Sequence, residues 1–296
     1  MPEMPEVEAL RSFLADQVVG RTIVRADLAA FAALKTFEVP LSALHGLEVT
    51  RVERHGKFLC LDADGTWLAF HLARAGWLTW HDTVPATPVR PGKGPLALRV
   101  VFEGDAAGST DDGEVGFSLT EAGTQKHLAI HVVAELAEVP GIARLGPDPL
   151  APDFTRDDFA AVIRANARTQ VKGLLKDQSA LAGIGNAYSD EILQAARLSP
   201  FKVAGSLSHD EVTALFEAIR GELATAIERA VGNRPSDLKD GKRTTMRVHG
   251  KKGEPCPTCG TPIAEVSFAE TFLNYCPGCQ TGGKLLADRR MSKLLK

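Results

Sequence analysis

Four cysteines near the C-terminal end of the chain have the residue type and spacing of a metal site. Cys256 and Cys259 are separated by two residues, Cys276 and Cys279 repeat that spacing, and 16 residues lie between the pairs. Each pair can direct two thiolates at one ion, so together they predict one tetrahedral Zn²⁺ with no open position, a structural site. Two redox-active pairs are the alternative. Cys60 lies in an apolar run and is expected in the core.

The N-terminus offers a second chemistry. Met1 precedes the small residue Pro2, so we expect its removal and a free secondary amine on Pro2. An α-amino group has a pKa of about 7.7–8.0, so part of it is neutral and nucleophilic at physiological pH. Such an amine attacks an aldehyde-like carbon to give an iminium ion, and Glu3 is placed to act as general acid or base. An inert Pro-Glu start is the alternative reading of these two residues.

Charge is distributed unevenly along the chain. The net charge of the 296 residues is −3, but residues 231–296 hold 12 Lys and Arg against 6 Asp and Glu, and residues 1–230 hold 22 against 31. A basic segment joined to an acidic body suggests contact with a polyanion, although a solvated basic tail explains the charge equally well. The basic residues that flank the cysteines favour a phosphate backbone. They are Arg247, Lys251, Lys252, Lys284, Arg289, Arg290 and Lys293.

The composition is that of a folded globular protein. Apolar residues make up 44% and charged residues 24%, which excludes global disorder and supplies a sizeable core. No run approaches the roughly 18 apolar residues of a membrane helix, and the first residues do not resemble a signal peptide. Five cysteines argue against a disulfide framework. We therefore expect a soluble, cytoplasmic protein of about two domains, without a membrane partner.

The elements that must position these groups are first a helix and then strands. Apolar residues at helical spacing, with Pro5 before them and Gly20 after them, predict a helix at the N-terminus. Asp64-Gly65 between two apolar runs indicates a hairpin. Pro-rich residues 82–95 are expected to form a loop, and the acidic, Gly-rich residues 103–113 a connection between strands. The strand-like runs are 22–24, 47–49, 58–61, 67–70, 96–102 and 127–130.

Helices dominate after a segment rich in Gly and Pro that is typical of a linker. Periodicity predicts helices over 154–167, 171–177 and 186–196, the last preceded by a Gly-Ile-Gly turn. Ser208 and Glu211 form a capping-box pattern at the start of a further helix that runs to about Ala230. Residues 233–252 are polar and basic, and the Cys-containing remainder is hairpin-like.

Several motifs coincide in one order along the chain and together resemble one known family. These are Pro2-Glu3-Met4-Pro5-Glu6, Arg54-His55-Gly56-Lys57, His71-Leu72, Leu145-Gly146-Pro147-Asp148-Pro149, Ala182-Gly183-Ile184-Gly185-Asn186 and Gly250-Lys251-Lys252-Gly253 before the cysteine pairs. The chain is similar over nearly its whole length to the formamidopyrimidine-DNA glycosylase and endonuclease VIII family of DNA repair enzymes.

The resemblance implies an α+β fold and a domain order. An N-terminal helix and β-sandwich are expected over residues 1–138, a linker over 139–152, and a helix–two-turn–helix domain over 153–240. A zinc finger over 241–282 and a basic tail over 283–296 would complete the chain. The resemblance also implies that a monomer binds damaged DNA in a cleft between the domains.

The resemblance implies a mechanism for base-excision repair as well. The Pro2 amine would attack C1′ of a damaged nucleotide, the base would leave, and a Schiff base would link protein and sugar before elimination cuts the strand. Glu3 would assist proton transfers and Lys57 would contact the sugar or phosphate. The base must leave the duplex stack to be reached. The expected DNA contacts are His71, Arg74, Lys172, Asn186, Lys251 and Lys252.

Two departures from the family pattern bear on strand preference. The hairpin between the cysteine pairs has Thr271 where the family carries an Arg, and a hydroxyl cannot replace a charged, bidentate fork. Arg74 occupies the place of a Met, and residues 121–127 replace a loop with an Arg-Phe pair, both of which fill the gap left by a flipped nucleotide. We therefore expect a preference for single-stranded, open or abasic DNA.

Three functions are compatible with the sequence. A bifunctional glycosylase and abasic-site lyase is favoured by Pro2, Glu3 and Lys57. A protein that binds lesions or abasic sites without excision is favoured by the missing hairpin Arg. An enzyme of narrower class, such as an abasic-site lyase or one acting on adducts or crosslinks, is the third. A fold alone does not choose among them.

Overall fold

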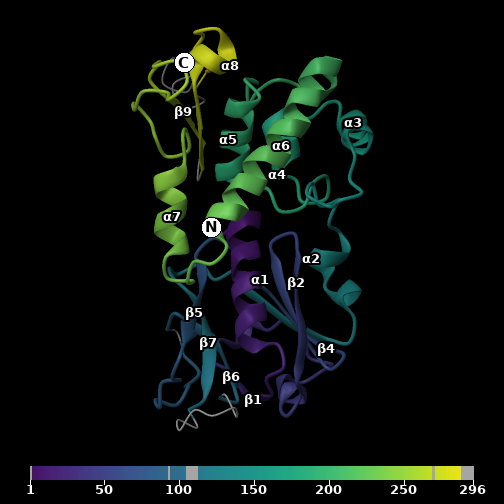
Figure 1. Ribbon diagram of the computed structural model, residues 1–296, viewed down its shortest axis with the longest axis vertical. Coiled ribbons are helices and arrows are strands. Elements are labelled where there is room, and N and C mark those ends of the chain that lie inside the picture. The colour runs from purple at the N-terminus through teal and green to yellow at the C-terminus, as the bar shows by residue number, and fades with distance from the viewer. Residues whose placement is uncertain (1, 93, 105–112, 269–270, 288–296) are drawn as a thin grey trace. The chain divides into compact units, whose positions relative to one another are not determined.

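The chain divides into two compact units in a computed structural model that describes residues 2–92, 94–104, 113–268 and 271–287 (Figure 1). Unit 1 comprises Met1–Arg144 and Ala230–Leu238, and unit 2 comprises Leu145–Arg229 and Lys239–Lys296. The chain therefore leaves unit 1, enters unit 2, returns to unit 1 for a short stretch, and ends in unit 2. The predicted basic tail lies largely outside the described residues.

Unit 1 is the predicted β-sandwich behind an N-terminal helix. One antiparallel sheet has the strand order β1-β6-β7-β5 and the other the order β2-β3-β4-β8. The elements are α1 (Met4–Val18), β1 (Ile23–Leu28), β2 (Val49–His55), β3 (Phe58–Ala63), β4 (Thr66–His71), β5 (Gly76–His81), β6 (Leu96–Phe102), β7 (Val115–Glu121), β8 (Ala129–Val133) and α2 (Pro140–Ala143). The short 3-10 helices η1 (Phe31–Ala33), η2 (Leu41–Leu44) and η3 (Leu136–Glu138) lie between them.

A single apolar core joins α1 to both sheets. Val7, Leu10 and Leu14, one face of α1, are fully buried in it together with inward-facing residues of the strands. The predicted hairpin forms between β3 and β4, where Asp64 and Gly65 both have positive φ, as a two-residue turn of type I′ requires. The core therefore fixes α1, and with it the start of the chain, on the sheets.

Unit 2 is helical and ends in a small β-hairpin. Its elements are α3 (Arg156–Ala165), α4 (Val171–Lys176), α5 (Asn186–Ala195), η4 (Ala204–Ser206), α6 (His209–Ala230), α7 (Leu238–Thr245), β9 (Ala264–Ser267), β10 (Phe272–Tyr275) and α8 (Pro277–Thr281). The predicted capping box is confirmed, because Ser208 N–H donates to Glu211 and Glu211 N–H donates to the Ser208 hydroxyl. Within the described residues, no helix combines the length and the apolar composition needed to cross a bilayer.

The elements that were not predicted include β5, β7 and α7. β5 and β7 pair with each other and complete one sheet of unit 1. Helix α7 lies in the segment expected to be irregular, and Leu238 is its one buried residue. The other residues of α7 are mostly charged or small, so the sequence shows no helical spacing of apolar residues there.

Candidate functional site

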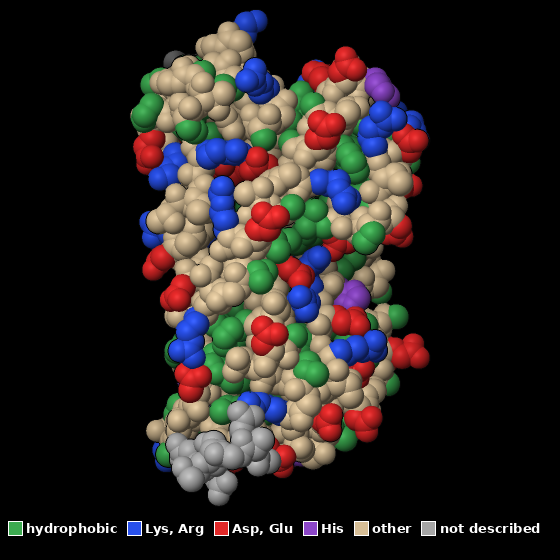
Figure 2. Space-filling view, in the orientation of Figure 1, with side chains coloured by type: hydrophobic (Ala, Val, Ile, Leu, Met, Phe, Trp, Pro, Cys, Tyr) green, Lys and Arg blue, Asp and Glu red, His purple; other side chains and the backbone are tan. Residues whose placement is uncertain are grey.

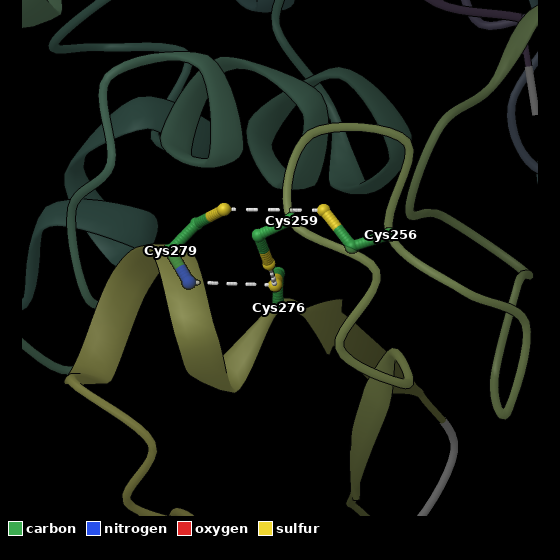
Figure 3. A group of neighbouring side chains, drawn as sticks. All are labelled: Cys256, Cys259, Cys276 and Cys279. Carbon is green, nitrogen blue, oxygen red and sulfur yellow. Dashed lines mark hydrogen bonds between the residues drawn. The ribbon is translucent and has the colours of Figure 1, made fainter.

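The four cysteines converge on one point in unit 2 (Figure 3). Their four sulfurs lie within 4.8 Å of one another. The Cys256–Cys279 sulfurs are 3.9 Å apart and the Cys259–Cys276 sulfurs 3.3 Å apart, close to the edge of about 3.8 Å that four Zn–S bonds of about 2.3 Å give in a tetrahedron. The donor set and its size fit Zn²⁺, with every position taken by protein.

Neighbouring polar groups tune these thiols. Hydrogen bonding with Thr261 lowers the pKa of Cys259 to about 6, so this sulfur is readily available as a thiolate. Gln194 of α5 extends its amide toward Cys256 and donates to Thr258 at 3.1 Å. The cluster is thus tied to the helices of unit 2 by a partner outside the coordination set.

The N-terminal residues are held rigidly at the start of α1. Glu3 is the N-cap, in an extended conformation, and its N–H donates to the Glu6 carboxylate at 2.8 Å. Pro2 is buried and Glu3 is only 2% exposed. Chain termini are ordinarily loose, so a buried and capped terminus is a positioned group.

Lys57 is positioned by an ion pair between α1 and the β2–β3 hairpin. Arg54 donates to Glu8 at 2.7 Å and to the carbonyl of Gly56, the residue before Lys57 in the turn. Burial raises the pKa of Glu8, but hydrogen bonds from Arg11 and Arg54 outweigh it and hold that pKa below its usual value. The carboxylate is therefore charged, and it connects α1 to the turn that carries Lys57.

His71, at the end of β4, is held in its neutral form. Burial, assisted by the charge of Lys57, lowers the pKa of His71 to about 4. The Nδ1 atom accepts the Ala73 N–H at 3.1 Å, and the ring contacts Phe58 at 4.8 Å between centroids. The remaining proton is accordingly assigned to Nε2, which is then a hydrogen-bond donor. Lys57 and His71 are close in the sheet, because Phe58, the residue after Lys57, is the pairing partner of His71 in the β3–β4 ladder.

Arg74 and the 121–127 loop lie at two turns of unit 1. Arg74 is exposed in the β4–β5 turn, which is tight enough that a Cβ on Gly76 would lie 2.1 Å from the Leu72 carbonyl oxygen. The loop after β7 is organised by the buried Glu121 carboxylate, which accepts the backbone N–H groups of His127 and Leu128. The intervening residues are exposed, and none is aromatic apart from the imidazole of His127.

Lys172 is buried and makes contacts within unit 2. It is 7% exposed, and its ammonium group donates to the Asn186 carbonyl, the Ser189 hydroxyl and the Asp190 carboxylate. An ammonium group has three N–H donors, and these three acceptors are all within the protein. Lys172 therefore joins α4 to the first turn of α5, and the DNA contact expected of it stays a prediction.

Asn186 lies at the first position of α5 and is half-buried. Its amide donates to the Phe272 carbonyl at 2.9 Å, so the end of the helix is joined to β10 of the cysteine hairpin. The same hairpin is anchored from below by Asp190, whose carboxylate accepts His249 Nδ1 at 2.7 Å and Asn274 N–H at 3.1 Å.

The basic residues before the cysteines have different roles. Lys251 and Lys252 form ion pairs with Glu254 and Glu265 near the surface, and such pairs are weak enough to be exchanged for phosphate. Arg247 pairs with Glu222 at 2.7 Å and with the buried Glu191, and its contact with a phosphate backbone stays a prediction. On the face drawn in Figure 2, basic and acidic side chains are interspersed.

Two buried carboxylates of α5 were missed by the sequence reasoning. Asp190 and Glu191 are 1% and 3% exposed. Glu191 accepts the backbone N–H groups of Arg247, Val248 and His249 and so fixes the segment that enters the zinc hairpin. The sequence holds no local signal for their burial, because consecutive acids lie about 100° apart on a helix and can both face solvent.

Comparison with known proteins agrees with this geometry. The family models for the formamidopyrimidine-DNA glycosylase N-terminal domain, its H2TH domain, and the zinc finger found in that enzyme and in IleRS match residues 1–117, 145–235 and 253–282. The formamidopyrimidine-DNA glycosylase of Symbiobacterium thermophilum is 36% identical over 302 residues, covering 98% of this chain and 93% of that protein. An uncharacterized formamidopyrimidine-DNA glycosylase-like protein of Mycobacterium tuberculosis is 50% identical over 161 residues, covering 54% of this chain and 100% of that protein.

Solved structures give the same result. The Thermus thermophilus formamidopyrimidine-DNA glycosylase superimposes with a TM-score of 0.76 at 30% identity, covering 96% of this chain and 100% of that one. The Lactococcus lactis enzyme in complex with DNA containing an abasic site gives 0.78 at 25% identity, covering 94% and 99%. The matched finger and the four converging cysteines indicate one structural zinc ion. With three family models matched in order and a relative aligned over almost its full length, the chain belongs to the formamidopyrimidine-DNA glycosylase family of base-excision repair enzymes.

Proposed function

We propose that this chain is a bifunctional DNA glycosylase and abasic-site lyase that uses the Pro2 amine as its nucleophile. The observation that carries the proposal is the fixed N-terminus, in which Pro2 is buried and Glu3 caps α1. A nucleophile must be presented in one geometry to give a large effective concentration at the reacting carbon. A capped and buried terminus meets that requirement.

The proposed reaction follows from the chemistry of a secondary amine. The Pro2 nitrogen bonds to C1′ as the bond from C1′ to the damaged base breaks, and the base leaves with a proton. Glu3 protonates the ring oxygen as the sugar opens to the iminium ion. Loss of a C2′ proton then expels the 3′ phosphate, and a second elimination expels the 5′ phosphate. Lys57, beside the neutral His71, supplies positive charge for the phosphates.

Further DNA contacts are proposed from both units. The Nε2–H of His71 and the exposed Arg74 of unit 1 would donate to phosphates. In unit 2 we propose Asn186, at the N-terminus of α5, and the surface lysines Lys251 and Lys252. Lys172 acts here as a positioning residue, because its ammonium group holds the Asn186 turn.

We also propose that open or single-stranded DNA is preferred over intact duplex. Apolar wedges help to unstack a duplex, at a cost of a few kcal/mol per step, and the exposed residues of the 121–127 loop include none. Equal cutting of the same lesion in both forms would contradict this preference. If Arg74 itself inserts, Arg74→Ala should lose activity on duplex DNA alone.

Covalent trapping tests the central proposal. The chain is incubated with an oligonucleotide containing one abasic site, and borohydride reduces the iminium to a stable amine. We expect a trapped complex from the processed chain and none from a form that retains Met1, which serves as the control because its Pro2 nitrogen is an amide and cannot attack C1′. Absence of trapping from both forms, with zinc bound and DNA binding intact, would reject the lyase and favour a protein that binds lesions without excision, the candidate that Thr271 supports.

A further inference from the structure

A pocket in unit 2 takes part in none of the proposed bond-making and bond-breaking steps, although Asn186, a proposed DNA contact, lies at its edge. It has a volume of about 360 Å³ and is lined by residues of unit 2 from α4, the start of α5, the segment after α5 and the β9–β10 hairpin. The residues that matter for its chemistry are Phe201, Phe268, Phe272, Thr271, Gly173 and Lys176. A volume of this size falls within the range of small-molecule sites.

Three aromatic rings give the pocket its apolar walls. Phe272 is 39% exposed, although large apolar side chains ordinarily avoid solvent, and Phe201 and Phe268 are half-buried. Phe272 is nevertheless held in place, because its ring stacks on His249 at 5.4 Å with 17° between the planes, and its carbonyl accepts the Asn186 amide. The walls are thus a preformed stacking surface.

The α4 side of the pocket is open and carries one available cation. Gly173 is exposed and has no side chain to fill the space, and the nearest atom to a Cβ built on it is the Thr169 methyl group at 3.3 Å. Lys176, one turn further along α4, is exposed, and within the described ranges its ammonium group has no hydrogen-bond or ion-pair partner. Lys172 is neutralised by Asp190. The pocket therefore combines aromatic faces with a single positive charge at its edge.

We propose that this pocket binds one unpaired nucleobase of the DNA strand, stacked on Phe272 and its aromatic neighbours, with the adjoining phosphate at Lys176. The proposal rests on the proposed function only in taking a DNA strand as the ligand. Every base has a π face, so stacking on phenylalanine is sequence-tolerant, and a neighbouring cation follows the backbone. A paired base has both faces covered by its stack, so the site selects an open or single strand.

The position of Thr271 agrees with this assignment. It is half-buried and lines the pocket beside Phe272. A charged Arg at this position would place a guanidinium group beside the rings, whereas Thr supplies only a short hydroxyl that can bond a base edge. Thr271 therefore has two effects: it lacks the charge for a phosphate contact in the hairpin, and its small side chain leaves the aromatic pocket accessible.

Binding of undamaged single-stranded oligonucleotides tests the pocket without catalysis. Fluorescence anisotropy is measured for the unaltered chain, Phe272→Ala, and Phe37→Ala, a control that truncates a 77% exposed phenylalanine of unit 1. We expect Phe272→Ala to bind about tenfold more weakly and Phe37→Ala to bind normally. Oligonucleotides in which a tetrahydrofuran residue, which lacks the base and cannot form an iminium ion, replaces one nucleotide at successive positions should show one position where base removal costs the unaltered chain about tenfold but costs Phe272→Ala nothing further.

Gly173→Leu provides an independent variant, because it fills the pocket from α4 and replaces a poor helix former by a good one. It should reproduce the loss while keeping one zinc per chain and a Tm no lower than that of the unaltered chain. The proposal would be overturned if all variants bound the oligonucleotides with equal affinity. It would also be overturned if base removal weakened binding equally in Phe272→Ala and in the unaltered chain. Borohydride trapping reports on Pro2 alone, so failure of one proposal is distinguishable from failure of the other.

Discussion

At the scale of single residues, His71 is the group whose environment is most informative. Its ring is half-buried near Lys57, and the loss of solvation lowers its pKa to about 4. A protonated imidazole would place a second positive charge next to the lysine in a poorly solvated position. The folded protein therefore keeps His71 neutral, and at low pH this lowers the free energy of unfolding.

Stability should fall in acid through His71. The unfolded chain binds a proton at His71 with a pKa of about 6.5, whereas the folded chain does so only near 4. The free energy of unfolding should therefore decrease as the pH is lowered from about 6.5 to 4, by about 3 kcal/mol in total from this residue. His71→Gln should flatten that part of the curve in urea unfolding, whereas His127→Gln, which changes an exposed histidine, should not. Parallel curves for His71→Gln and the unaltered chain would contradict the assignment.

Lys172 and Lys176 lie on the same helix, α4, but we expect different roles for them: Lys172 holds the turn that carries Asn186, and Lys176 binds a phosphate. Lys172→Met leaves Asp190 buried without its lysine, so we expect a loss of about 3–5 kcal/mol in the free energy of unfolding. Lys176→Met, at an exposed position, should leave stability nearly unchanged but lower the slope of log affinity against log salt for single-stranded DNA by about 0.7. If the slope of log affinity against log salt fell in Lys172→Met and not in Lys176→Met, Lys172 would be the lysine that contacts DNA directly.

At the scale of elements, the Arg54–Glu8 pair joins α1 to the β2–β3 hairpin. Both side chains are largely buried, at 10% and 19% exposed. Arg54→Met should therefore cost about 3 kcal/mol of stability. It should also slow covalent trapping, because the turn that carries Lys57 and the terminus that carries Pro2 lose their shared fixed point.

The matched control for this prediction is Arg25→Met. Arg25 and Glu114 form a pair of similar length that is more exposed, at 35% and 40%, so its loss should cost at most about 1 kcal/mol. Urea unfolding and single-turnover trapping measure the two effects. Equal losses for the two variants would show that the Arg54 pair has no special positioning role.

The elements that the sequence predicts are those with a strong local pattern. Apolar spacing in α1, the Asp64-Gly65 turn and the Ser208 capping box depend on neighbours within a few residues. In β7, apolar residues alternate with small or polar ones, but the acidic, Gly-rich segment before it makes the beginning of the strand hard to recognise in the sequence. Helix α7 has almost no apolar face. Local pattern alone does not reveal such elements, because their pairing partners stabilise them.

The candidate site divides in the same way. The cysteine spacing predicts the zinc site because each pair is local and its chemistry is specific. The Arg54–Glu8 pair spans 46 residues, and Asp190 reaches His249 and Asn274 over 59 and 84. Contacts at that distance along the chain depend on the three-dimensional fold, so neither the buried state of Lys172 nor the aromatic pocket could be read from the sequence.

At the scale of the whole molecule, the zinc ion should stabilise unit 2 selectively. The cysteines, β9, β10 and the segment held by Glu191 all belong to that unit, and structural zinc contributes directly to folding. Removal by a chelator should abolish hydrogen-exchange protection in residues 247–268 and 271–280, while the strands of unit 1 keep theirs. Metal analysis should give one zinc per chain, and Cys259→Ser should lower it. Uniform loss of protection across both units would contradict selective stabilisation.

The return of Ala230–Leu238 to unit 1 has a consequence for synthesis on the ribosome. The last strand of the sandwich, β8, ends at Val133, but Trp77 donates to the Pro235 carbonyl and Leu238 packs in the sandwich core. At about 5–20 residues per second, the roughly hundred residues between them take on the order of 5 to 20 s to make. The newly synthesised sandwich therefore lacks Leu238 in its core until most of unit 2 has been translated. During this interval its apolar core is incompletely covered, and chaperones can bind the exposed surface.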